Sequence, residues 1–128
     1  MNISLIYFNF PFWRAEVARV SLFIGNIDFK DIRISSEEFQ RVKEKGQLDN
    51  GTLIPFHQLP CLIVDGEVLA QTAGIARFCG KLTNLYPSLD IEAARVDQYI
   101  DMASDITNII SMTKLEDRDS QFLKDLKK

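Results

Sequence analysis

The 128-residue sequence predicts an α/β fold, a small mixed sheet with helices on both faces, followed by a part built of helices alone. Three observations predict it. Strand-like and helix-like patterns alternate through the first part of the chain, two strands flank the turn Asp65-Gly66, and only helical patterns follow the break at Tyr86-Pro87. The expected order is β-α-β-α-β-β-α and then helices, with a boundary near residues 82–90.

The first three elements are a strand, a helix and a second strand. Residues 3–8 form a short apolar run with β-branched residues, which is typical of a strand. From Arg14 onward, apolar residues recur at three- and four-residue steps and indicate an amphipathic helix with the stripe Val17, Val20, Phe23 and Ile24. Gly25-Asn26 ends this helix, and the alternation over residues 29–34 predicts a half-exposed strand.

The remaining elements follow from capping signals and periodicity. Ser35-Ser36 before two glutamates predicts a helix that runs to about Lys45, and the polar residues 46–52 predict a loop. After the hairpin we expect a helix from Gln71 to about Lys81. A long helical pattern begins at Leu89, and the charged residues 116–128 predict a helix fragment.

Composition narrows the class of protein. The chain is 46% hydrophobic with a net charge of −3, so it has no basic footprint for nucleic acid. Its apolar runs are too short to span a membrane, and residues 1–4 do not begin a signal peptide. Cys61 and Cys79 form no CxxC pair, so we expect two buried, reduced thiols in a cytoplasmic protein without a metal site.

Residues 58–77 contain the most informative pattern. Pro60 opens a strand of the hairpin, and the second strand runs into Gln71-Thr72, where a helix begins. The free N–H groups and dipole of a helix N-terminus favour a carboxylate. A proline-fixed backbone edge close to such a terminus suits the capture of a peptide-like anion.

Five segments in this order and spacing resemble the cytosolic glutathione transferases. They are Leu5–Asn9, Arg14–Glu16, Pro55–Pro60, Val64–Gly66 and Ala70–Thr72. The resemblance covers residues 2–82 and the first helix after them. It is greatest to the sigma-type enzymes, which use a tyrosine and include glutathione-dependent prostaglandin D synthase.

The resemblance implies a thioredoxin-like glutathione-binding domain over residues 1–83 and part of an all-helical C-terminal domain over residues 88–128. It implies a cytoplasmic homodimeric transferase that acts in detoxification. Such an enzyme uses glutathione as co-substrate and activates its thiol for attack on a small electrophile, or for glutathione-dependent isomerisation. No metal is expected, because Ser104 replaces an acid of the cation site that the synthase carries near Asp101 and Asp105. We expect the aspartates 97, 101 and 105 to form a stripe on the helix that faces solvent or an interface.

The resemblance makes Tyr7, at the end of the first strand, the catalytic residue. A free thiol has a pKa of about 8.5, so only a few per cent is thiolate at neutral pH. A shift of about two pKa units amounts to roughly 3 kcal/mol, and a hydrogen bond to a charged group supplies about 1.5–3 kcal/mol. One hydroxyl that donates to the glutathione sulfur therefore supplies most of the effect. The alternative is a tyrosine that only packs at a strand end.

The resemblance also assigns the rest of the glutathione site. Pro60 matches a cis-proline that exposes the Leu59 backbone, next to Gln58, to the cysteinyl part of glutathione; the alternative is a trans proline that opens an edge strand. Gln71 and Thr72 match the pair that holds the γ-glutamyl end, and a plain helix cap is the compatible alternative.

The resemblance implies five further positions. Arg14 and Lys43 match residues that reach the carboxylates or the sulfur region, although Lys43 also fits a solvated helix face. Phe39 stands where the family usually has tryptophan and lacks the indole donor. His57, often glycine in the family, is expected to act through its backbone, and Asp105 to reach the amino group across a dimer interface.

Three departures bear on activity. Phe10–Trp13 replaces a smaller, glycine-bearing loop after the tyrosine, and an insertion occupies residues 44–56. The chain also stops at Lys128, where the resemblance implies further helices, so apolar faces around Ile106 and Ile110 are expected to be exposed. A non-catalytic binding or crystallin-like protein of the same fold is the alternative function. A thiol-disulfide oxidoreductase is disfavoured because residues 7–10 contain no cysteine.

Overall fold

The computed structural model of the chain describes residues 1–113 and has the predicted order of elements. Residues 116–128, expected as a helix fragment, lie outside the described residues. The elements are β1 (Ile3–Phe8), α1 (Glu16–Ile24), β2 (Lys30–Ile34), α2 (Ser36–Lys45), the short 3-10 helix η1 (Pro55–His57), β3 (Cys61–Val64), β4 (Glu67–Ala70), α3 (Thr72–Leu82) and α4 (Asp90–Met112).

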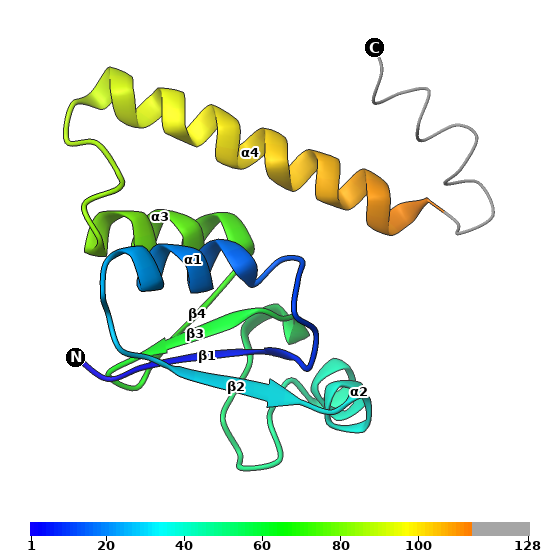
Figure 1. Cartoon of the computed structure of the whole chain (residues 1–128). Coiled ribbons are helices and arrows are strands. Elements are labelled where there is room, and N and C mark those ends of the chain that lie inside the picture. Colours follow the sequence, from blue (N-terminus) through cyan, green and yellow to red (C-terminus); the bar gives the residue numbers. More distant parts are fainter. Residues whose placement is uncertain (114–128) are drawn as a thin grey trace.

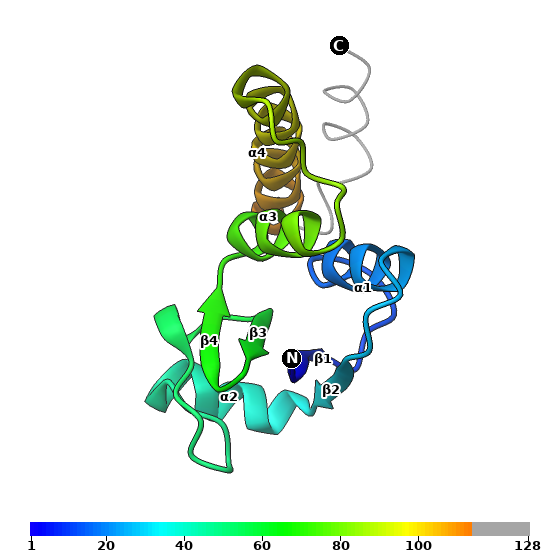
Figure 2. The same cartoon turned by 90° about the vertical axis from the view of Figure 1, so that its left-hand side faces the viewer.

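The four strands form one mixed sheet in the order β2-β1-β3-β4. β1 pairs parallel with β2 and antiparallel with β3, and β3 and β4 form the hairpin. Helices α1 and α3 cover one face of the sheet and α2 covers the other (Figures 1 and 2). The predicted fold class is therefore confirmed.

Alternate residues of β1 contribute to two separate cores, as the period of a strand requires. Leu5 and Tyr7 pack in the core beneath α1 and α3, whereas Ile6 packs with Val42 on the α2 side. Cys61 and Cys79 are fully buried free thiols, as predicted. Tyr7 thus lies on the same side of the sheet as the start of α3.

Helix α2 begins and ends as its capping residues predict. Ser35 Oγ accepts a hydrogen bond from the Glu38 N–H at 3.1 Å, and Gly46 ends the helix with φ +69°. The His57 ring lies over Gly46, where a Cβ atom would meet it. This contact joins the end of α2 to the segment that precedes Pro60.

The predicted apolar stripe of α1 is wrong, although the helix itself is confirmed. Val17, Val20, Phe23 and Ile24 are all exposed, and Phe23 is 82% exposed, whereas Ala15, Ala18 and Leu22 are buried. Because alanine side chains are small, α1 can lie close to the sheet and to α3 on its alanine side. The larger apolar residues lie on the opposite side of the helix, so a prediction based on them assigns the wrong side to the core. β2 is also more exposed than expected, since only Ile34 of this edge strand is buried.

Helix α4 crosses above α3 and α1 and has no buried residue (Figure 1). Ile106, Ile109 and Met112 are exposed along it, as expected, whereas Ile110 is half-buried. Within the described residues, no helix is long and apolar enough to cross a membrane.

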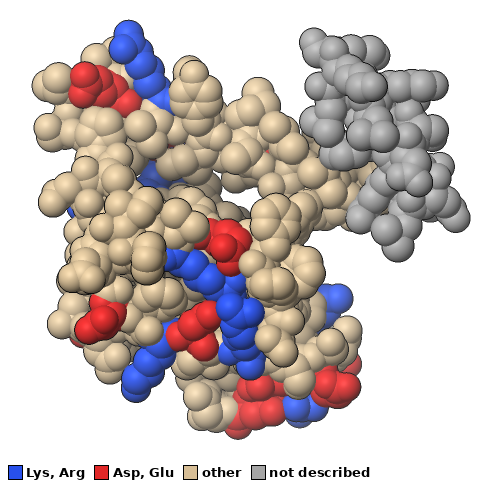
Figure 3. Space-filling view, viewed as in Figure 1, with Lys and Arg blue, Asp and Glu red and all other residues tan. Residues whose placement is uncertain are grey.

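Charges of both signs lie side by side on the face shown in Figure 3. Asp31 pairs with Arg19 at 3.3 Å and with Arg33 at 2.9 Å.

Candidate functional site

A cavity of about 540 Å³ opens at the carboxyl end of β1, where the loop after β1, the segment before β3 and the start of α3 meet. Its lining comprises Tyr7, Phe8, Trp13, Arg14, Phe39, Gln58, Leu59, Pro60, Gln71, Thr72 and Asn108. Eight of the eleven residues proposed from the sequence are among them. The cavity therefore brings together segments from both ends of the described chain.

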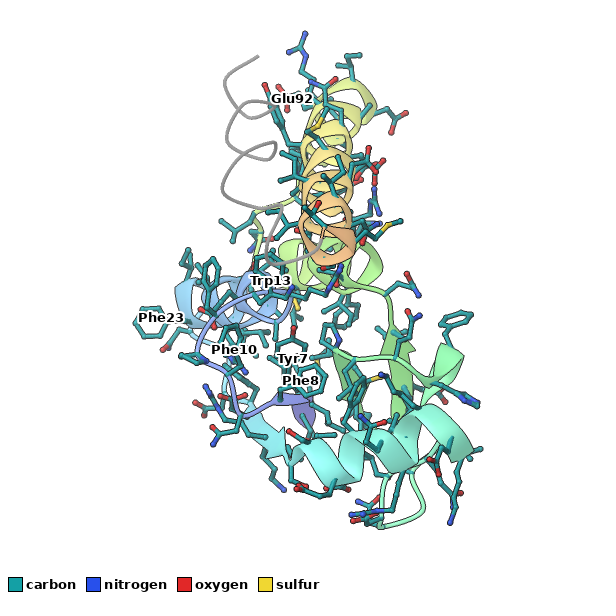
Figure 4. The ribbon with its side chains drawn as sticks, turned by 90° about the vertical axis from the view of Figure 1, so that its right-hand side faces the viewer. Tyr7, Phe8, Phe10, Trp13, Phe23 and Glu92 are labelled. Carbon is teal, nitrogen blue, oxygen red and sulfur yellow. The ribbon has the colours of Figure 1, made fainter. Side chains whose placement is uncertain are left out.

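Tyr7 is 2% exposed and presents its hydroxyl to this cavity from the end of β1 (Figure 4). Burial raises the pKa of Tyr7. A hydrogen bond from the Arg14 backbone N–H, and the charges of Arg14 and Arg19, oppose this rise without reversing it. The hydroxyl therefore stays protonated at neutral pH. A protonated hydroxyl keeps a hydrogen that it can donate to a ligand in the cavity.

The Leu59–Pro60 peptide bond is cis, which confirms the sequence prediction and excludes the trans alternative. β3 begins directly after it, at Cys61, and the Cys61 thiol donates to the Gln58 carbonyl oxygen at 3.4 Å. Residues 58–60 all line the cavity. The backbone at Leu59 thus forms one edge of the cavity, beside the Tyr7 hydroxyl.

The N-terminus of α3 forms another edge. α3 begins at Thr72, and Gln71 occupies the cap position with φ +72° and without a side-chain capping bond. Positive φ in a residue other than glycine is sparsely populated and tends to occur where function requires it. Within residues 1–113, neither side chain has a hydrogen-bond partner, so both can serve a bound ligand. The helix dipole favours a negative group at this position.

The loop after β1 contributes Trp13 to the cavity lining. Trp13 lines the cavity and has φ +92°, whereas Phe10 and Phe12 are exposed. Figure 4 shows Trp13 close to the start of α1 and below the end of α4. The following residue, Arg14, donates to Asn108 Oδ1 at 3.2 Å and to Ser111 Oγ at 2.9 Å, and both acceptors lie on α4.

Three residues proposed from the sequence are not part of the cavity lining. Lys43 Nζ lies 5.1 Å from the centre of the ring of Phe39, which does line the cavity. The His57 Nδ1 atom lies 3.0 Å from the Lys43 carbonyl oxygen, which turns the imidazole toward α2. Asp105 lines a smaller neighbouring cavity of about 260 Å³ together with Arg14 and Thr72.

Phe8, Trp13 and Asn108 line the cavity but were not proposed as site residues. Phe8 packs edge-on against Phe39, with the ring centres 4.4 Å apart. Asn108 lies one helical turn after Asp105, so the period of α4 contained a signal for it. Nothing in the sequence pattern alone indicated that this turn of α4 reaches the loop after β1.

The aspartate stripe of α4 is largely engaged in pairing with α3. Arg77 binds Asp97 at 2.7 Å and Asp101 at 2.8 Å, and the Tyr86 hydroxyl donates to Asp97. The hydrogen bond from Arg77 lowers the pKa of Asp97. No group of three or more His, Cys, Asp or Glu residues in the described part of the chain is arranged to hold a metal ion.

Comparisons with known proteins agree on one family. The family model described as "Glutathione S-transferase, N-terminal domain" matches residues 3–80. Glutathione S-transferase 1 of Ascaris suum is 38% identical over 90 residues, which is 70% of this chain and 40% of that protein. Human hematopoietic prostaglandin D synthase is 33% identical over 104 residues, 81% of this chain and 48% of the synthase.

A solved structure extends the likeness to the fold. The monomeric glutathione S-transferase Na-GST-3 of the hookworm Necator americanus aligns with a TM-score of 0.72 and 33% identity. The alignment covers 84% of this chain and 48% of that structure. The chain spans about half the length of the curated relatives that it matches.

Proposed function

This chain belongs to the glutathione S-transferase family, and from this premise we propose that its cavity binds glutathione and activates the thiol. One observation carries the proposal. A single cavity contains a buried tyrosine hydroxyl, the backbone edge at a cis-proline and the open N-terminus of a helix. These are the three groups needed for a thiol, a peptide backbone and a carboxylate.

Each part of glutathione has a counterpart in this arrangement. The γ-glutamyl carboxylate binds at Gln71 and Thr72, where the α3 N–H groups are free. The cysteinyl backbone pairs with Leu59 in strand fashion. The glycyl end extends toward Phe39, and Lys43 Nζ lies 5.1 Å from the centre of that ring.

The proposed chemistry begins with loss of the thiol proton to solvent. The Tyr7 hydroxyl then donates a hydrogen bond to the thiolate and stabilises it. For conjugation, the thiolate attacks an electrophilic carbon, a carbon–sulfur bond forms, and the displaced group leaves with its electron pair. The raised pKa of Tyr7 supports this role, because only a protonated hydroxyl can donate. Isomerisation assisted by glutathione uses the same thiolate.

The finer assignments are also part of the proposal. We assign the chain to the tyrosine-using, sigma-like branch, with a glutathione-binding domain over residues 1–83 and a helical part over residues 88–128. Cytoplasmic location fits the two free, buried thiols. A homodimer would bring Asp105 of the partner subunit toward the glutathione amino group, although the hookworm relative is described as monomeric.

Calorimetry with glutathione and turnover of a chloro-dinitro aromatic compound test the proposal together. We expect measurable binding, and we expect Tyr7→Phe to lower kcat/KM about tenfold to a hundredfold, the range of one charged hydrogen bond. Phe23→Leu, at an 82% exposed position of α1, is the control and should change neither quantity.

Three outcomes are distinct. Absence of glutathione binding would overturn the proposal as a whole. Turnover that Tyr7→Phe leaves unchanged would overturn the tyrosine mechanism and retain the binding site. Binding without turnover of any electrophile would favour the alternative, a non-catalytic glutathione-binding protein of this family.

A further inference from the structure

Arg14 links the end of α4 to the residue proposed as catalytic. Arg14 and Tyr7 line the same cavity, and hydrogen bonding from the Arg14 backbone opposes the rise in the pKa of Tyr7. The Arg14 guanidinium donates to Asn108 Oδ1 at 3.2 Å and to Ser111 Oγ at 2.9 Å. The Ser111 hydroxyl donates in turn to the Thr107 carbonyl oxygen at 2.9 Å. Because the Ser111 hydrogen is used in that bond, the Ser111 oxygen acts as an acceptor toward Arg14.

The residue before Arg14 makes such a link necessary. Trp13 has φ +92°, a region that favours glycine. A side chain in this region persists only where its surroundings hold it. Trp13 is followed immediately by the Arg14 N–H, so any relaxation of the Trp13 backbone would rotate that N–H away from Tyr7.

We propose that Asn108 and Ser111 are positioning residues that fasten Arg14 to α4 and thereby keep the Trp13–Arg14 backbone against the Tyr7 hydroxyl. We name the three residues Arg14, Asn108 and Ser111 the α4 clamp. The clamp acts on the hydroxyl through the Arg14 backbone and does not require contact between α4 and the thiol. Its consequence for catalysis rests on the proposed function, whereas its effect on the loop does not.

The chain provides its own probe of the clamp. Trp13 is the sole tryptophan among the 128 residues, so intrinsic fluorescence reports on this loop alone. Acrylamide quenching of Trp13 and hydrogen exchange of the Arg14 amide are measured on the full chain without glutathione. Asn108→Ala/Ser111→Ala removes both acceptors, and Gln98→Ala, at an exposed position of the same helix, is the matched control.

In the double variant we expect the Arg14 amide to exchange about tenfold faster, which is the protection that one hydrogen bond supplies, and Trp13 to be quenched more readily. Asn108→Asp with Ser111→Thr retains both acceptors and should restore the wild-type values. In a Trp13→Gly background, glycine adopts φ +92° unaided, so removal of the clamp should change Arg14 exchange much less.

Two readouts connect the clamp to the thiol. In the double variant, the apparent pKa of the bound glutathione thiol, measured by thiolate absorbance, should rise. The decrease in kcat should be larger than the change in KM. Unchanged Arg14 exchange and unchanged Trp13 quenching in the double variant would overturn the clamp. A wild-type chain that fails to bind glutathione would overturn the proposed function, while exchange and quenching still decide the clamp. Circular dichroism of each variant verifies that it is folded.

Discussion

The Arg77 guanidinium of α3 lies 2.7 Å from the Asp97 carboxylate of α4, and this ion pair fastens the long helix to the rest of the fold. Asp101, one turn further along α4, binds the same guanidinium at 2.8 Å. Because α4 has no buried residue, polar contacts carry a large share of its docking. The position of α4 matters for the cavity, since Asn108 lies on the same helix.

The first prediction concerns the pH dependence of this docking. Arg77 holds the pKa of Asp97 below its usual value of 3.8, so the contribution of the pair is complete above that value and is lost as the pH falls through the lowered pKa. The melting temperature of Arg77→Met should therefore lie below that of the wild type at neutral pH. The difference should shrink when the pH falls below 3.8. A constant difference over the whole pH range would contradict this assignment.

The second prediction tests which side of α1 is buried. Leu22 is fully buried and Phe23 is 82% exposed, although the two are adjacent in the chain. Leu22→Ala should lower the free energy of unfolding by about 2–5 kcal/mol. Phe23→Ala should change it by less than about 0.5 kcal/mol. Urea unfolding of both variants measures this, and a larger loss for Phe23→Ala would mean that α1 is rotated.

The third prediction concerns the two thiols. Burial raises the pKa of Cys61 and of Cys79 to about 11, so almost no thiolate forms near pH 8. Neither residue should react with an aromatic disulfide reagent in the native chain, and both should react fully in urea. Stoichiometric labelling of one native thiol would show that its burial is wrong.

The fourth prediction concerns the contact between Gly46 and His57. Gly46→Ala places a side chain at φ +69° and against the His57 ring, so it should cost about 1–2 kcal/mol from the backbone conformation alone, with the clash added. His57→Ala removes the clash but leaves the backbone cost. The double variant should therefore be more stable than the sum of the single changes in urea unfolding. Strict additivity would argue against the contact.

The fifth prediction separates residues that line the cavity from those that do not. Thr72→Val removes a hydroxyl at the start of α3 and should weaken glutathione binding about tenfold in calorimetry. His57→Ala should leave the affinity nearly unchanged, because the imidazole faces α2. Equal losses in the two variants would place His57 in the binding site.

Short-range sequence signals were enough to predict many of the secondary-structure elements. Ser35 and Gly46 mark the ends of α2 by capping rules that depend on a few neighbouring residues, and the Asp65-Gly66 turn marks the hairpin in the same way. The alternation in β1 and the proline before β3 led correctly to the sheet and to the cis bond. Family resemblance supplied most of the proposed site residues, because the pattern around Pro60 and Gln71-Thr72 is local in sequence.

Other features of the protein depend on packing between segments that are distant in the sequence, and only the tertiary structure shows them. The buried side of α1 follows from how closely alanines let it approach α3, which periodicity does not measure. The pairing of Arg77 with Asp97, and of Arg14 with Asn108 and Ser111, joins residues 20 to 97 positions apart. Sequence by itself determined the elements and their order and led to the cis bond before Pro60, whereas the roles of Tyr7 and Thr72 remain part of the proposal. The docking of α4 decided what holds the loop beside Tyr7, because such contacts arise only when the helices pack together.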